Sequence, residues 1–264
     1  MYLDCVILIS GQSNALGYNT DAVIKSIDER IFIFNIVLNR WEVYKDINFC
    51  FGYSFAKEYV GKYKNKRIGM IIVGGVGQSI CNWVEKGNSY KHESKTNKED
   101  RGTLMTSSIM YTRDAMSKLK HKKKIDCILW HQGEADYDES NLYYYWRVRK
   151  VIETYRKESW ASAETPFIAG ELMTGEYDYQ NAALNALNYD KDVKSGCIAC
   201  KYLEGSDSIH YDTTSHAIMG ILYYKKYRQM KSNSFINLLI RYKHRIVEYE
   251  KTIRTFFWHR FSRN

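Results

Sequence analysis

Short apolar segments of strand length alternate with amphipathic segments along most of the chain. Runs rich in branched residues fall at 5–9, 31–36, 68–73, 125–130, 166–169 and 196–199. Over 104–119 and 139–156, apolar residues instead recur every three or four positions, as on one face of a helix. Alternating strands and helices form parallel sheets that are covered by helices on both faces. The pattern predicts an α/β fold: a three-layer α/β/α sandwich with a central parallel sheet of about five strands.

Small polar loops follow four of these strands directly or after a few residues. Their sequences are SGQSN at 10–14, GGVGQS at 74–79, HQGEAD at 131–136 and EGSDSIH at 204–210. Ligands of parallel sheets bind beyond the carboxyl ends of the strands, where such loops converge. We therefore expect a functional site to be built from these four loops.

The first loop places Ser13 between a buried strand and the start of a helix. A serine there exposes its hydroxyl and has a backbone N–H without an intrahelical partner, so it can attack a carbonyl and help to bind the oxyanion. The alternative is that Ser13 only caps the helix. Asp207 and His210, three residues apart in the last loop, supply a carboxylate and an imidazole for such a serine. The other histidines are interpreted as structural; for His131 the alternatives are a packed residue and a base.

An acyl-transfer site also needs fixed donors for the oxyanion. The backbone N–H of Gly77 and the side-chain amide of Gln132 are the candidates, although GGVGQS by itself also suits a simple turn. The loop lacks the Gly-Lys-Ser/Thr ending of a phosphate-binding loop, and no dinucleotide-binding glycine motif opens a helix.

Four motifs occur in one order: GQSN at 11–14, GQSICNW at 77–83, WHQGEAD at 130–136 and DSIH at 207–210. Together they resemble the four blocks of the SGNH hydrolase superfamily, and in particular its carbohydrate esterase branch with sialate O-acetylesterases and acetylxylan esterases. The resemblance covers residues 1 to about 230 and implies the flavodoxin-like SGNH hydrolase fold for a catalytic domain over 1–232. It also implies catalysis without a metal or other cofactor.

By this resemblance Ser13 is the nucleophile, His210 is the general base and then acid, and Asp207 orients His210. The Ser13 N–H, Gly77 and Gln132 then form the oxyanion hole. Residues with a possible supporting role share the same loops: Gln12, Asn14, Gly75, His131 and Glu134.

Three points stay open at the level of sequence. Gly75 is an alternative to Gly77, because Val76 stands where the family usually has the first glycine. Glu134, and less readily Asp212, competes with Asp207 for His210. Three aromatic residues beside the catalytic loops either stack on a sugar or only pack at the rim: Trp83, Tyr137 and Tyr211.

The composition is that of a globular protein, with 45% hydrophobic and 26% charged residues among 264 and a single proline. The first residues lack the basic segment of a secretory signal, no apolar window is long enough to span a membrane, and the six cysteines are scattered. These features favour a cytoplasmic protein. Cys197 and Cys200 form a C-x-x-C, but it lies in a predicted strand without a second pair, so a metal or redox role is not favoured.

The net charge of +9 is concentrated at the carboxyl end. Residues 225–264 contain eleven Lys and Arg and two Glu, which leaves 28 basic and 28 acidic residues in 1–224. Residues 233–264 form a second predicted unit, a basic amphipathic helical tail that suits either an anionic membrane surface, such as the inner membrane, or packing on the body or on a second copy. A nucleic-acid partner is not expected, because no binding motif accompanies the charge.

The sequence supports three functional hypotheses. The leading one is a serine esterase that removes O-acetyl groups from a carbohydrate, a sialic acid or similar glycan unit, through an acetyl-serine. The second is a carbohydrate O-acetyltransferase of surface-polysaccharide biosynthesis that uses the same site. The third is a glycan-binding or scaffold protein whose site is not catalytic.

Overall fold

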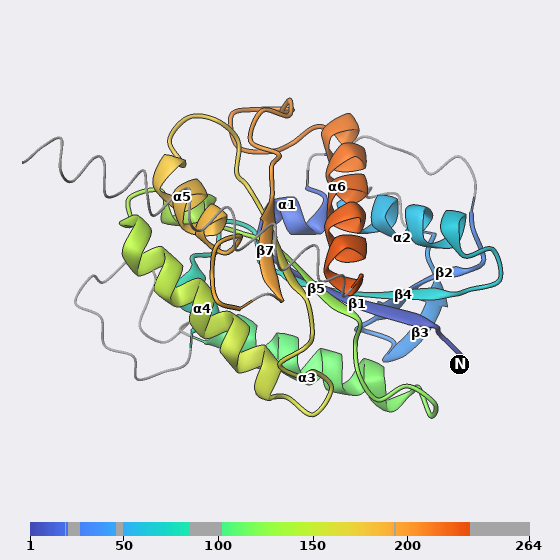
Figure 1. The fold of residues 1–264 in the computed structure, drawn as a ribbon. Coiled ribbons are helices and arrows are strands. Elements are labelled where there is room, and N and C mark those ends of the chain that lie inside the picture. The colour runs from blue at the N-terminus through green and yellow to red at the C-terminus, as the bar shows by residue number, and fades with distance from the viewer. Residues whose placement is uncertain (19, 21–26, 46–49, 85–101, 193, 233–264) are drawn as a thin grey trace, which may run out of the picture.

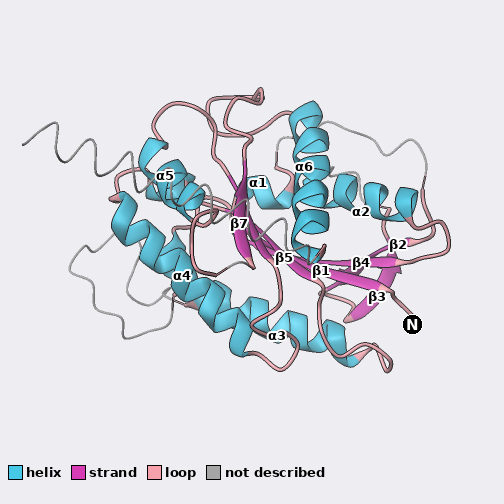
Figure 2. Cartoon of the chain, viewed as in Figure 1, coloured by secondary structure: helices cyan, strands magenta, loops and turns pink. Residues whose placement is uncertain are grey.

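The computed structural model describes residues 1–18, 20, 27–45, 50–84, 102–192 and 194–232. The predicted tail at 233–264 lies outside the described residues, so the domain boundary stays a prediction. Seven strands form one sheet in the order β3-β2-β4-β1-β5-β6-β7 (Figures 1 and 2). The strands are β1 (Cys5–Gly11), β2 (Ile31–Asn35), β3 (Arg40–Val43), β4 (Ile68–Gly74), β5 (Cys127–His131), β6 (Phe167–Gly170) and β7 (Ser195–Ile198).

The predicted α/β class is confirmed, but the sheet is larger than the expected five strands. It is also not entirely parallel, because β3 pairs antiparallel with β2 at one edge. This strand was missed because it is only four residues long and only Trp41 and Val43 in it are apolar. The turn before β3 contains Asn39 with a φ of 48°, a backbone conformation that asparagine tolerates better than most residues.

Helices cover both faces of the sheet, as Figure 1 shows. The long helices are α2 (Phe51–Lys62) and α6 (Thr213–Lys231) on one face, and α3 (Thr103–Ser117), α4 (Asn141–Lys157) and α5 (Asp178–Ala186) on the other. Successive side chains of β1 point to opposite faces, so Val6 and Leu8 join a different buried cluster from Ile7 and Ile9. Because both faces are covered, every residue of β1 is buried, which explains its uninterrupted apolar run.

The register of the central strands brings three of the polar loops together. Gly11 at the end of β1 pairs with Gly74 at the end of β4 on one side and with His131 at the end of β5 on the other. The chain continues from these residues into the short helix α1 (Ser13–Leu16) and the 3-10 turns η1 (Ile80–Trp83) and η3 (Glu134–Asp136). The predicted convergence of these loops at one sheet edge is therefore present in the structure.

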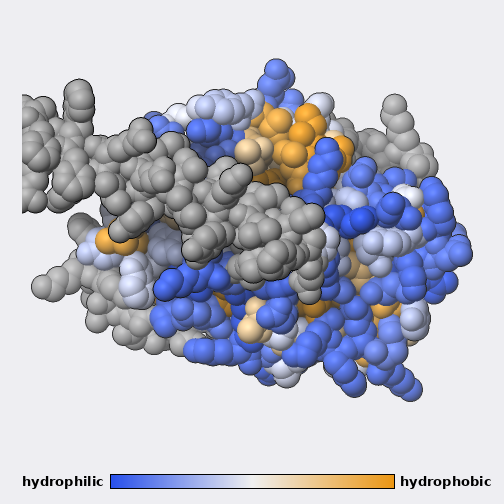
Figure 3. All heavy atoms as spheres, viewed as in Figure 1, coloured by the Kyte–Doolittle hydropathy of each residue, from blue (hydrophilic) through white to orange (hydrophobic). Residues whose placement is uncertain are grey.

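Most of the described surface that is visible in Figure 3 is hydrophilic, in keeping with the charged residue content. Among the described residues, no helix combines the length and the apolar character needed to cross a membrane.

Candidate active site

Ser13 begins helix α1 directly after β1, at the point where Gly11 lies close against the neighbouring parallel strand β5. Gly11 has a φ of +150°, and a Cβ on it would lie 1.9 Å from the carbonyl oxygen of His131. The next residue, Gln12, donates its backbone N–H to that oxygen over 3.0 Å and is the residue that precedes the helix. Ser13 is therefore the first helical residue and not its cap, and its backbone N–H has no hydrogen-bond partner among the described residues.

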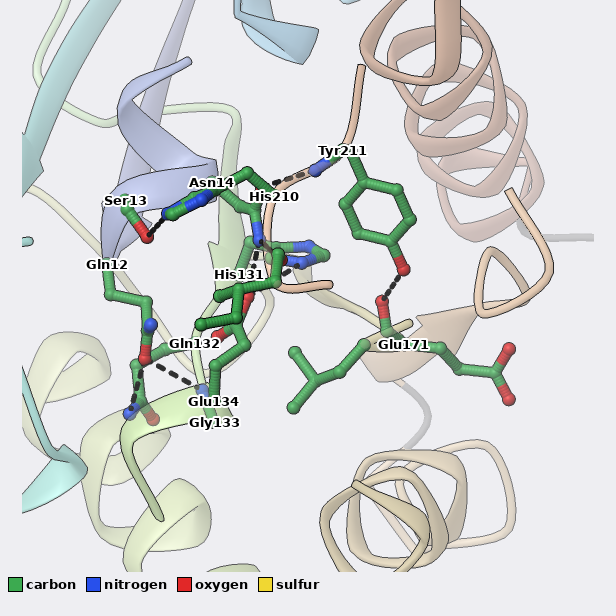
Figure 4. A network of polar contacts seen from close by, with 12 residues as sticks. Gln12, Ser13, Asn14, His131, Gln132, Gly133, Glu134, Glu171, His210 and Tyr211 are labelled. Carbon is green, nitrogen blue, oxygen red and sulfur yellow. Dashed lines mark hydrogen bonds and ion pairs between the residues drawn. The ribbon is translucent and has the colours of Figure 1, made fainter. Parts of the chain in front are cut away.

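The hydroxyl of Ser13 lies within hydrogen-bonding distance of His210, although 197 positions separate the two residues in the sequence. The distance between Ser13 Oγ and His210 Nε2 is 3.1 Å, and Figure 4 shows the two residues side by side. The other ring nitrogen of His210, Nδ1, lies 2.8 Å from Asp207 Oδ2. The three residues thus form a continuous hydroxyl, imidazole and carboxylate chain.

Asp207 is held ionised by its own loop. Its Oδ1 accepts the backbone N–H groups of Ile209 at 2.7 Å and of His210 at 2.6 Å. Partial burial by itself would raise the pKa of Asp207, but these bonds and the one from the His210 ring outweigh it and lower the pKa to about 2. A carboxylate that is charged at neutral pH stabilises a proton on the imidazole beside it.

The two rival partners of His210 are engaged elsewhere. Glu134 Oε1 accepts a hydrogen bond of 2.6 Å from Asn14 Nδ2 and lies 3.7 Å from His131 Nε2. Asp212 caps helix α6, where its side chain accepts the backbone N–H of Ser215 at 2.7 Å. The structure therefore brings Asp207, and neither of these two carboxylates, to the imidazole.

Asn14 fixes the loop that carries His210. Its Nδ2 also donates to the carbonyl of Ile209 over 3.0 Å, and its Oδ1 accepts the N–H of Tyr211 over 3.1 Å. The residues on both sides of His210 are thereby attached to the helix that starts at Ser13. The sequence indicated Asn14 only as a supporting residue, because a bond to a loop so far along the chain has no local signal.

Of the two candidate glycines, only Gly77 has a backbone N–H that is free among the described residues. Gly77 lies in the left-handed region with a φ of +65°, and it lines the same cavity as Ser13 and His210. The N–H of Gly75 instead donates to the carbonyl of Gly11 over 3.2 Å. The geometry thus favours Gly77 over Gly75 as an oxyanion donor.

Gln132 is buried and its amide is already used. Its Nε2 lies 2.5 Å from Asp136 Oδ2, 3.2 Å from the carbonyl of Gln78 and 3.3 Å from Gln12 Oε1. Its Oε1 accepts the hydroxyl of Tyr144 at 3.1 Å. Gln132 does not line the cavity that contains Ser13. The structure therefore does not place the Gln132 amide where the sequence led us to expect an oxyanion donor.

His131 is a packed residue, which is one of the two roles that the sequence left open. Its ring is fully buried between the rings of Phe51 and Tyr211, and its Nδ1 lies 3.3 Å from the Tyr223 hydroxyl. Burial, with a small contribution from nearby His216, lowers the pKa of His131 to about 3. His131 is therefore neutral at physiological pH.

A cavity of about 390 Å³ opens above Ser13 and His210. Its other lining residues are Gln12, Val76, Gly77, Ser79, Glu134, Ala135, Tyr137, Asp138 and Ile209. This volume is within the range of small-molecule sites.

Of the three aromatic residues for which sugar stacking and rim packing were the alternatives, only Tyr137 lines this cavity. Tyr137 is 43% exposed there, whereas Trp83 and Tyr211 are fully buried. Trp83 packs edge-on against Trp130, and the Tyr211 hydroxyl donates to the carbonyl of Glu171 (Figure 4). Tyr18 was not predicted to belong to the site, although the centre of its ring lies 4.9 Å from that of His210. The only feature of the sequence that could have indicated Tyr18 is its position shortly after the GQSN motif.

No group of three or more His, Cys, Asp or Glu side chains within the described ranges could hold a metal ion. Cys197 and Cys200 are buried thiols, and Cys200 Sγ donates to the carbonyl of Glu171 over 3.0 Å. Burial raises the pKa of both thiols, which therefore stay protonated.

The structure places a hydroxyl, an imidazole and a carboxylate in one chain of contacts at the carboxyl end of the sheet. This chain of groups is the arrangement found in serine hydrolases. Comparison with known proteins narrows the class. The chain matches the family model "Carbohydrate esterase, sialic acid-specific acetylesterase" over residues 4–229. No curated protein matches the chain at a significant level.

Solved structures with the same fold include a protein of Arabidopsis thaliana, which has 17% identity and a TM-score of 0.66 over 86% of this chain and 99% of that one. NanS has 11% identity and a TM-score of 0.59 over 87% of this chain and 98% of its own. A carbohydrate acetylesterase of Xanthomonas citri has 16% identity and a TM-score of 0.59 over 83% of this chain and 54% of that chain.

The chain belongs to the carbohydrate esterase family of sialic acid-specific acetylesterases, because the family model covers most of its length. The predicted resemblance to carbohydrate esterases is confirmed. The protein is accordingly a carbohydrate acetylesterase.

Proposed function

We propose that the protein removes O-acetyl groups from a sialic acid or similar glycan unit through an acetyl-enzyme on Ser13. The observation that carries the proposal is the chain of contacts from Ser13 Oγ to His210 Nε2 and from His210 Nδ1 to Asp207. Ser13 and His210 of this chain line a cavity large enough for an acetylated sugar ring. Membership of the esterase family supports the same reaction.

In the first half-reaction, Ser13 Oγ attacks the acetyl carbonyl carbon while His210 Nε2 takes the hydroxyl proton. The carbonyl oxygen becomes an oxyanion beside the free N–H groups of Ser13 and Gly77. When the tetrahedral intermediate collapses, the bond between the acetyl carbon and the sugar oxygen breaks, and His210 gives its proton to that oxygen. The sugar alcohol leaves and an acetyl ester remains on Ser13.

In the second half-reaction, His210 takes a proton from water, whose oxygen attacks the acetyl-serine. Collapse of the second intermediate returns the proton to Ser13 Oγ and releases acetate. Asp207 stays ionised throughout and stabilises the imidazolium that forms in each half.

The proposal is tested with O-acetylated sialic acid and an acetylated neutral sugar, each incubated with the pure protein. Mass spectrometry of the sugars and assay of free acetate follow the reaction, with and without an added non-acetylated acceptor sugar. We expect loss of acetyl groups and stoichiometric acetate from the wild type, no reaction with Ser13→Ala, and full activity with Ser117→Ala, which changes an exposed serine on α3.

Three results would contradict the proposal. Acetyl groups that appear on the acceptor sugar in place of free acetate would identify an acetyltransferase. Binding of the sugars without any reaction would identify a glycan-binding protein. Undiminished activity of a folded Ser13→Ala protein would remove Ser13 from the mechanism.

A further inference from the structure

The side-chain donor expected from the HQGE motif is not available in this protein. Gln132 Nε2 has only two hydrogens, and three acceptors surround it: Asp136 Oδ2, the Gln78 carbonyl and Gln12 Oε1. Burial raises the pKa of Asp136, but the bonds from Ser79, Gln132 and the Ile80 N–H favour its charged form. Releasing Gln132 toward the cavity would therefore break a buried, charge-assisted bond.

The side chain of Gln12, immediately before Ser13, has the opposite arrangement. Its Oε1 is surrounded by three donors: Gln132 Nε2 at 3.3 Å, the Ala135 N–H at 3.3 Å and the Gly133 N–H at 3.4 Å. Backbone N–H groups can only donate, so the atom that faces them must be the carboxamide oxygen. The orientation of the amide is thereby fixed, and its nitrogen must face the other way.

That nitrogen faces the reacting centre. In Figure 4 the dashed lines from Gln132 and Gly133 end on the Gln12 oxygen, and the nitrogen lies on the side toward Ser13. Gln12 lines the cavity with Ser13, Gly77 and His210, although only 2% of the residue is exposed. Its Nε2 has no hydrogen-bond partner among the described residues.

We propose that the Gln12 carboxamide is the side-chain donor of the oxyanion hole, and that Gln132 acts as a positioning residue that holds it. The inference rests on the proposed acetyl-serine mechanism and deepens it. Gln12 Nε2–H joins the N–H groups of Ser13 and Gly77 around the oxygen that becomes negative. Because three donors already hold Oε1, the amide does not reorganise as charge develops, and its near-complete burial strengthens the interaction.

The test uses the Gln12→Met and Gln12→Glu variants. Met has a similar size and no donor; Glu retains an oxygen for the three N–H groups and replaces the donor nitrogen with a second oxygen. We expect kcat for an aryl acetate to fall by roughly 10²–10³ in both, the range for loss of one oxyanion donor, while KM changes little. Gln229→Glu, on the exposed side of α6, is the matched control and retains wild-type kcat.

A second substrate separates a donor from a merely structural residue. In an aryl thionoacetate, sulfur replaces the carbonyl oxygen, and sulfur accepts hydrogen bonds weakly. The wild type is expected to hydrolyse the oxygen ester much faster than the thiono ester. Loss of the Gln12 donor lowers this rate ratio by about the same factor as kcat. Gln132→Met removes one of the three groups that hold Gln12 and leaves the Gly133 and Ala135 N–H groups in place, so it lowers the ratio less than Gln12→Met does.

The outcomes separate this inference from the proposed function. Wild-type protein that hydrolyses neither aryl nor sugar acetates would overturn the proposed function and this inference with it. The Gln12 assignment alone would be overturned if the wild type is active and the folded Gln12 variants keep either the wild-type kcat or the wild-type rate ratio between the two substrates. Collapse of the ratio in Gln132→Met but not in Gln12→Met would return the donor role to Gln132.

Discussion

Glu134 is predicted to make the free energy of unfolding depend on pH, by an amount that follows from the structure. The residue is buried at the wall of the cavity, where Asn14 donates to its Oε1, and its Oε2 has no partner among the described residues. Burial, only partly offset by the Asn14 bond, raises its pKa from 4.5 to about 7. Replacing Glu134 with Gln keeps an oxygen for Asn14 and removes the titrating group.

The sign of the pH effect follows from where each state holds the proton. Below about pH 4.5 Glu134 is protonated in both states and contributes no pH dependence. As the pH rises toward 7, the unfolded chain loses the proton while the folded protein retains it, so the free energy of unfolding falls. A shift from 4.5 to about 7, at 1.36 kcal/mol per unit, amounts to about 3 kcal/mol.

Glu134→Gln is therefore expected to gain about 3 kcal/mol of stability relative to wild type between pH 4 and pH 8. The measurement is urea unfolding of both proteins at half-unit pH steps, with Glu153→Gln, on the exposed side of α4, as a control that shows no such gain. Buried His131 and His216 also titrate on unfolding, but they are common to both proteins and cancel in the difference. A difference in stability that is constant with pH, or that favours wild type as the pH rises, would show that folding does not raise the pKa of Glu134.

Three further substitutions test the framework of the site. Asp207→Asn is expected to lower kcat/KM by roughly 10²–10⁴ in an aryl acetate assay, and a loss of less than tenfold would contradict its role. Little change in Tm is expected, because the Asp207 side chain is 42% exposed. Asn14→Ala removes three hydrogen bonds and should cost roughly 2–4 kcal/mol in urea unfolding as well as kcat; retained kcat would show that His210 is held in another way. Gly11→Ala places a Cβ 1.9 Å from the His131 carbonyl oxygen at a φ of +150°, so we expect a loss of stability on the order of 3–5 kcal/mol; near-wild-type stability would contradict the close approach of the paired ends of β1 and β5.

The fold could largely be predicted from sequence because strands that are covered on both faces have continuous apolar runs. β1, β4 and β5 are such strands, and their ends carry the motif loops. The antiparallel edge strand β3 was not predicted, because it is short and alternates polar with apolar residues. Its pairing with β2 depends on a tight turn at Asn39 rather than on a long apolar signal.

At the site, the motifs located the reacting groups but not the direction of each side chain. Ser13, Asp207 and His210 are brought together as predicted in sequence, whereas Trp83 and Tyr211 point into the core. Gln12 and Gln132 are both amides of motif loops, and only the donors around Gln12 Oε1 show which of them faces the cavity. Such orientation depends on contacts between loops that are distant in the chain, so no local pattern encodes it.

In the proposed mechanism, the Ser13 hydroxyl is activated by His210 and becomes acetylated during turnover. The most direct measurement is acid quenching of the pure protein during steady-state hydrolysis of an aryl acetate, followed by peptide mass spectrometry. We expect one acetyl group, on the peptide that contains Ser13, and none in the His210→Ala protein. Continued turnover with no acetyl group on Ser13, or equal acetylation of Ser13 without His210, would contradict this mechanism.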